Sequence, residues 1–276
     1  MKWLQFILSH SIFIAVCAAA LAFQTVQLLN LQHHFPLYGF IFCATLCSYN
    51  FYWMLSKFSL MTDYSLLQVY KKEQTGLLLM LFAGTGMLLF FYQSGLALRF
   101  IIAAVALTIL YSIPLLPIRF LHFTRKAGVF KTFLLAFTWA YVTVIIPLQK
   151  SIFHLSGADF FVFTRRFLFM LMLCIIFDNR DKAMDKIRGL HSLATDLKPM
   201  MLNLLIYFIF AVLFISNFFY KQFGIHAWHS VGLQVSTLAL LVVYFFSQKK
   251  QGYLFYYFIV DGMMLFSAIA TFVAGI

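Results

Sequence analysis

The strongest constraint in this sequence is a succession of long apolar runs with very little polar chain between them. Hydrophobic residues make up 63% of the 276 residues and charged residues 10%, whereas an ordinary soluble domain has roughly 45–50% and 25%. A water-soluble globule of this length could not hide 36 Phe side chains in its core. The sequence therefore excludes a soluble domain and predicts that the bilayer surrounds most of the chain.

Each apolar run approaches the length of a transmembrane helix, which needs about 20 residues. Charged or turn-rich breaks separate nine such runs, so we expect an all-α polytopic membrane protein with about nine transmembrane helices and one domain over residues 1–276. The expected helices are 5–29, 36–55, 76–92, 96–116, 129–148, 160–183, 200–219, 227–247 and 253–274.

Lys and Arg residues set the expected orientation, because cytoplasmic loops are enriched in them. With the N-terminus inside, 15 of the 20 Lys and Arg residues fall on the inner side. The outer side then holds Arg99, Lys150, Arg165, Arg166 and Lys221. We therefore expect an integral membrane protein with a cytoplasmic N-terminus. Topology and anionic lipid headgroups then explain the net charge of +12, and no nucleic-acid partner is indicated.

Three aspartates near one end of the sixth expected helix stand out, because polar groups within a membrane are costly unless they are paired or face a cavity. Asp178, Asp181 and Asp185 are spaced by three and four residues, so they share one helix face. Clustered carboxylates suit a hard cation such as Mg²⁺. The alternative is a solvated helix end, in which Asp178 pairs with Lys182 and Asp185 with Arg188.

Several helices are expected to bring polar residues to a similar depth. If Arg166 marks the outer interface, Asp178 lies about 18 Å into the membrane. Asn50 and Tyr111 lie about 10 Å and 12 Å from the nearest inner-side cation along their helices, and Asp261 lies about 12 Å into the last run. For Asn50 and Tyr111 the alternative is an ordinary hydrogen bond between helices.

Two stretches resemble motifs of the UbiA superfamily of intramembrane prenyltransferases. The stretch DNRDKAMDKIRGLHSL, residues 178–193, is similar to the second aspartate-rich motif of that family. LYSIPLLPIRF and the following RKAGVFKTFLLAFTWAYVTVIIP resemble its Tyr-Ser-x-Pro segment, basic loop and next helix. The matching residues are Tyr111, Pro114, Arg119, Gly128, Lys131, Trp139, Asp181, Asp185 and Gly189, and Ser192 stands where Thr is usual.

The first aspartate-rich motif of this family falls on NFYWMLSKF, residues 50–58, where its acids are missing. Asn50 remains, but Phe51, Met54 and Phe58 occupy the three acidic positions. In the family the two motifs together bind the diphosphate of an isoprenyl donor through Mg²⁺. The resemblance therefore implies that this chain retains at most part of that metal complement.

The resemblance implies a UbiA-like helical bundle around a central cavity, with the aspartate-rich loop on the cytoplasmic side. It also implies Mg²⁺-dependent transfer of an isoprenyl group from an isoprenyl diphosphate to a lipophilic acceptor, such as an aromatic compound or a quinone precursor. The implied metal ligands are Asp178, Asp181 and Asp185, the diphosphate contacts Asn50, Arg119, Lys131 and Arg188, and the catalytic residues Asp181, Asp185 and Tyr111. We expect Asn50, Tyr111, Asp178 and Asp181 around one cavity open to the inner side.

Two other functions remain open. A non-catalytic UbiA-like protein that has lost the first metal site would bind a prenyl lipid or a partner protein. A small-molecule transporter would also use acids within the membrane, but no inverted repeat and no pair of Gly/Pro-broken helices supports it. Membrane lipids are expected partners in every case.

Overall fold

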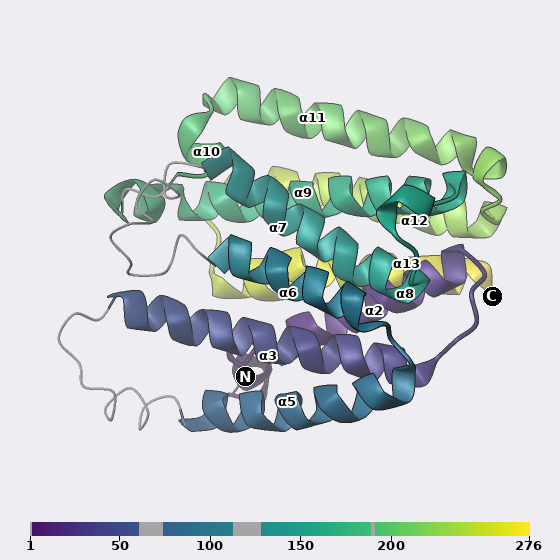
Figure 1. Cartoon of the computed structure of the whole chain (residues 1–276). Coiled ribbons are helices and arrows are strands. Elements are labelled where there is room, and N and C mark those ends of the chain that lie inside the picture. Colours follow the sequence, from purple (N-terminus) through teal and green to yellow (C-terminus); the bar gives the residue numbers. More distant parts are fainter. Residues whose placement is uncertain (1, 61–73, 113–127, 189–190) are drawn as a thin grey trace.

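The structure, a computed structural model, describes residues 2–60, 74–112, 128–188 and 191–276, and all regular secondary structure in these ranges is helical. The expectation of an all-α protein is confirmed. Figure 1 shows the long helices running side by side. The helices are α1 (Lys2–Ser9), α2 (Ile12–Leu28), α3 (Phe35–Leu60), α5 (Gln74–Ser94), α6 (Leu98–Ser112), α7 (Gly128–Ala140), η3 (Tyr141–Ile145), α8 (Ile146–Leu148), η4 (Ile152–His154), α9 (Gly157–Arg188), α10 (Leu193–Asp196), α11 (Pro199–Ser216), η5 (Asn217–Phe223), α12 (Ala227–Ser247), η6 (Phe255–Val260) and α13 (Asp261–Gly275).

The helices long and apolar enough to cross a membrane number six within the described residues, or seven if the bent pair of α1 and α2 is one span. Each of the nine expected ranges overlaps a helix of the structure. However, α6 has only 15 residues, and α3 is not among the six. The protein therefore has several membrane-spanning helices, and the count of nine stays a prediction.

The first expected helix, 5–29, is wrong in one respect, because the chain bends by 67° between α1 and α2. At the bend Ser11 has a left-handed backbone with φ of 62°. The His10 ring nitrogen Nδ1 lies 2.9 Å from the Phe6 carbonyl oxygen, and Asn50 of α3 donates to the His10 carbonyl at 3.0 Å. The Asn50 side chain thus satisfies the His10 carbonyl, a group that the end of a helix leaves without a helical partner.

Each long helix of the bundle packs on one or more neighbouring helices (Figure 1). α5 lies on α3, α3 on α2, α2 on α13 and α13 on α12, while α6 lies on α7 and α7 on α9. Tyr52 of α3 meets Tyr111 of α6 with their hydroxyl oxygens 3.2 Å apart. α9 is the most buried of the candidate spans, and its Met172 and Ile175 are completely buried. The acids of α9 are therefore carried by a central helix.

Two contacts tie α13 to its neighbours. Gln24 of α2 donates to the Thr271 hydroxyl at 2.7 Å and to the Ser267 carbonyl at 2.9 Å. Gly232 of α12 lies so close to α13 that a Cβ atom there would be 2.5 Å from the carbonyl oxygen of Ala270. Small residues at membrane helix interfaces allow this close approach, and side-chain hydrogen bonds add to it.

Candidate functional site

The C-terminal part of α9 places two of the three predicted metal ligands where their charges act on each other. The half-buried Asp178 accepts a hydrogen bond from the Thr132 hydroxyl of α7 at 2.5 Å. The charges of Lys131 and Asp185 both act on the Asp178 carboxylate. The Lys131 ammonium also lies 5.7 Å from the centre of the Tyr111 ring. Two acids, one lysine and one tyrosine therefore form a polar cluster between α6, α7 and α9.

Asp181, the third predicted ligand, makes a different contact. The Nε and Nη2 atoms of Arg180 each donate to one Asp181 carboxylate oxygen at 2.7 Å. The Arg180 guanidinium also lies 4.8 Å, 5.1 Å and 5.0 Å from the ring centres of Phe177, Tyr256 and Tyr257. A guanidinium over aromatic faces is a favourable cation–π arrangement. Asp181 is thus the carboxylate partner of an arginine that the aromatic rings hold in place.

These positions decide which carboxylates fit a Mg²⁺ ion. Within the described ranges, no group of three His, Cys, Asp or Glu residues is arranged to hold a metal. Mg²⁺ often takes only one or two carboxylates and completes its octahedron with water and substrate phosphate. The repelling pair Asp178 and Asp185 fits that requirement, whereas the charge of Asp181 is already compensated by Arg180.

A cavity of about 310 Å³ lies between α1, α3, α5 and the start of the last span. This volume is at the lower end of the range for small-molecule pockets, about 300–1,000 Å³. Tyr257 lines the cavity on one side and contacts Arg180 on the other, so the cavity and the Arg180–Asp181 pair are neighbours. The lining residues are Leu8, Ser9, His10, Asn50, Trp53, Met54, Gly76, Leu77, Met80, Tyr253 and Tyr257.

Asn50, at the start of the stretch that was compared with the first aspartate-rich motif, is buried and has a structural role. Its amide nitrogen donates to the carbonyl oxygens of Leu46 at 2.8 Å and of His10 at 3.0 Å. Both amide hydrogens are therefore used within the protein. The amide oxygen is the atom of Asn50 still able to accept a bond, which suits a water molecule or a metal-bound water better than a phosphate oxygen.

Of the four residues that were expected around one cavity, Asn50 is the one that lines the 310 Å³ cavity. Tyr111 and Asp178 belong to the polar cluster, and Asp181 pairs with Arg180. The expectation that these four residues share one cavity therefore stays a prediction. The hydroxyl contact between Tyr52 and Tyr111 and the hydrogen bond from Trp139 to Tyr49 at 3.1 Å link α3 to α6 and α7 through side chains.

Of the remaining predicted positions, some are described by the structure and others lie outside the described residues. Phe51 is 47% exposed and does not line the cavity, while Met54 does line it. Arg119 and Gly189 lie outside the described residues, as do the side chains of Phe58 and Arg188. Of the two pairs proposed for a solvated helix end, Asp178–Lys182 is not among the contacts of the described residues, where Asp178 accepts from Thr132.

Arg180, Thr132 and Tyr257 are site residues that the sequence analysis missed. Arg180 directly precedes Asp181 within the motif-like stretch, and the charge of Arg180 also acts on the buried Asp261 of the last span. The aromatic run YLFYYF at residues 253–258 is the sequence feature that could have indicated these contacts, because aromatic faces attract guanidinium groups such as that of Arg180.

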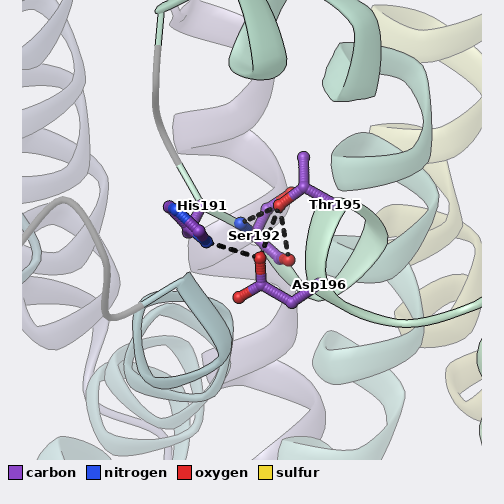
Figure 2. A network of polar contacts seen from close by, with 4 residues as sticks. All are labelled: His191, Ser192, Thr195 and Asp196. Carbon is purple, nitrogen blue, oxygen red and sulfur yellow. Dashed lines mark hydrogen bonds and ion pairs between the residues drawn. The ribbon is translucent and has the colours of Figure 1, made fainter.

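The end of the motif-like stretch is ordered by a local polar network (Figure 2). The Ser192 backbone N–H donates to the Thr195 hydroxyl at 2.7 Å, and the ring of His191 lies 2.7 Å from an Asp196 carboxylate oxygen. Ser192 directly precedes α10 and is 1% exposed. This part of the stretch therefore starts a helix.

Comparison with solved structures identifies the fold. The chain superposes on an apo structure of a UbiA homolog from Aeropyrum pernix K1 with a TM-score of 0.57 and 12% identity, covering 97% of each chain. It superposes on a structure of digeranylgeranylglyceryl phosphate synthase in membranes with a TM-score of 0.54 and 11% identity, covering 99% of each chain. No protein-family model and no curated protein sequence matches the chain.

The fold and the site together define a helical membrane protein with a polar, acid-bearing cluster between three of its helices. Its fold is the UbiA-like fold, as the motif resemblance led us to expect, and it extends over nearly the whole chain.

Proposed function

We propose that this protein is a UbiA-type membrane prenyltransferase, which moves an isoprenyl group from an isoprenyl diphosphate to a lipophilic aromatic or quinone-precursor acceptor. The observation that carries this proposal is the UbiA-like fold over 97–99% of the chain. The polar cluster supports it, because Lys131, Asp178 and Asp185 belong to the two stretches that resemble family motifs.

In this proposal the polar cluster binds the diphosphate. Asp178 and Asp185 would hold Mg²⁺, which would supply positive charge to the diphosphate oxygens. Lys131, with Arg119 and Arg188 by resemblance, contacts the leaving diphosphate and stabilises the charge that develops on it. The carbon–oxygen bond of the donor breaks to give diphosphate and an allylic cation. A carbon of the acceptor then bonds to that cation and loses its proton to the released diphosphate.

The aromatic residues of the site have complementary roles. The Tyr111 ring next to Lys131 offers a π face to cationic groups. Asp181 is a positioning residue that orients Arg180, and Arg180 in turn contacts the cavity residue Tyr257.

The cavity walls formed by Trp53 and Met54 suit the apolar chain of the donor or the ring of the acceptor. The site faces the cytoplasm if the Lys and Arg distribution sets the orientation.

The decisive experiment measures turnover by the purified protein. Farnesyl or geranylgeranyl diphosphate is supplied with Mg²⁺ and a panel of quinone precursors, and both diphosphate release and prenylated product are quantified. We expect Asp178→Asn and Asp185→Asn each to lower turnover by about 100-fold or more. Asp196→Asn is the matched control, because this exposed carboxylate pairs with His191 outside the polar cluster.

The same assay separates the remaining possibilities. A loss for Asp181→Asn as large as that for Asp178→Asn supports Asp181 as a metal ligand, and a smaller loss supports its action through Arg180. Donor binding without turnover by any acceptor favours the non-catalytic UbiA-like protein. If the wild-type protein neither binds nor consumes the diphosphates, the proposal is wrong.

A further inference from the structure

Two consecutive arginines, Arg165 and Arg166, are buried inside the bundle in the N-terminal half of α9. Their exposed fractions are 8% and 5%. Arg165 donates to the Leu213 carbonyl at 2.6 Å and to the Ser216 hydroxyl, both on α11. Arg166 donates to the Leu21 carbonyl at 3.1 Å and to the Gln24 side-chain oxygen at 2.8 Å, both on α2. Neutral acceptors on two different helices therefore hold the two guanidinium groups.

The charge of these arginines is not balanced by the part of the protein that the structure describes. None of the described carboxylates forms an ion pair with Arg165 or Arg166. Burying an ion away from water costs several kcal/mol after relaxation, and an arginine within a membrane protein is normally paired or faces a cavity. Two adjacent cations add their mutual repulsion to that cost. A negative counter-charge at this position would remove much of it.

A small cavity of about 30 Å³ lies at the arginines. Its polar lining consists of Arg165, Arg166, Gln24, Ser236, Thr237 and Ser267. Within the described residues, Nε of Arg165 and one Nη of Arg166 are buried donors without a hydrogen-bond partner. A cavity needs about 10–15 Å³ to hold one water molecule, so this one has room for a monatomic ion or one or two waters. It is too small for a diphosphate.

We propose that this cavity is an anion site that binds a monovalent inorganic ion of the size of chloride. The ion accepts hydrogen bonds from the free N–H groups of the two guanidinium groups, and it compensates the arginine charges within the bundle. The site is separate from the polar cluster, because Asp178 follows Arg166 by 12 positions along α9, a rise of about 18 Å. The proposal therefore does not depend on prenyl transfer.

Bromide provides a direct test, because it resembles chloride and scatters anomalously. Crystals of the wild-type protein grown in sodium bromide are expected to show an anomalous peak between Arg165 and Arg166. A cavity that holds only water under these conditions overturns the proposal. This measurement needs no variant, so it does not depend on whether an arginine substitution folds.

Thermal unfolding in detergent gives an independent readout in solution. We expect Tm of the wild-type protein to be about 3 °C or more higher in sodium chloride than in sodium gluconate at the same concentration. Arg166→Gln should lose this difference, whereas Arg99→Gln, which changes an exposed arginine on α6, should keep it. Equal Tm values of the wild-type protein in the two salts contradict the proposal.

Discussion

Arg180 shows how one side chain divides its interactions between charge and aromatic contact. The Asp181 side chain is 45% exposed, so water screens the ion pair and we expect it to contribute about 1 kcal/mol or less. Each well-placed aromatic face adds about 0.5–1 kcal/mol, and Arg180 has three such faces. At this residue the rings therefore outweigh the carboxylate.

A double-mutant cycle tests this balance. We expect Arg180→Gln to lower stability by about 1–2 kcal/mol through lost ring contacts, while the coupling between Arg180→Gln and Asp181→Asn stays below about 1 kcal/mol. Unfolding of the four proteins in detergent, followed by circular dichroism, gives these values. A coupling as large as the whole effect of Arg180→Gln would show that the ion pair dominates.

At the scale of elements, the positions of the helices were largely predictable and their breaks were not. Apolar runs place all nine ranges on helices because the bilayer demands length and low polarity. At the bend after α1, the His10 carbonyl accepts a hydrogen bond from Asn50, which lies 40 residues away in sequence. Likewise, Arg166 was expected to mark an interface, yet Leu21 and Gln24 hold it inside the bundle. Such long-range partners are not visible in local patterns.

Helix spacing makes a prediction about Gly232. We expect Gly232→Ala to lower stability by about 1–3 kcal/mol, because the new methyl group would press on the α13 backbone around Ala270 and force the helices apart. Gly84→Ala in α5 is the control, since a Cβ atom there meets no atom within 4 Å, and the substitution favours helix by up to about 1 kcal/mol. The measurement is Tm in detergent. Similar Tm changes for the two variants would contradict the close approach.

The molecule as a whole is organised along α9, whose 32 residues measure about 48 Å. The chain segments at its two ends are therefore expected on opposite sides of the membrane. Phe153, in η4 before α9, is 94% exposed, and His191 follows the other end. If the Lys and Arg distribution sets the orientation, Phe153 faces outward and His191 faces the cytoplasm.

Cysteine labelling tests that orientation. In a variant without the four native cysteines, we expect Phe153→Cys to react with a membrane-impermeant maleimide in intact cells, whereas His191→Cys reacts only after permeabilisation. Both should react equally once the membrane is opened, which controls for local accessibility. Labelling of His191→Cys in intact cells would reverse the assigned topology and would place the polar cluster at the outer surface.

The hydrogen bonds from Gln24 to Ser267 and Thr271 also bear on how the protein is assembled during synthesis. Ribosomes complete the second helix long before the last one, so Gln24 enters the bilayer while its later partners are still untranslated. Until α13 arrives, an amide and the neighbouring Arg166 lack part of their final surroundings. Maturation of the fold therefore waits for its final segment, and nascent chains stalled before that segment should be preferred substrates of membrane quality-control proteases.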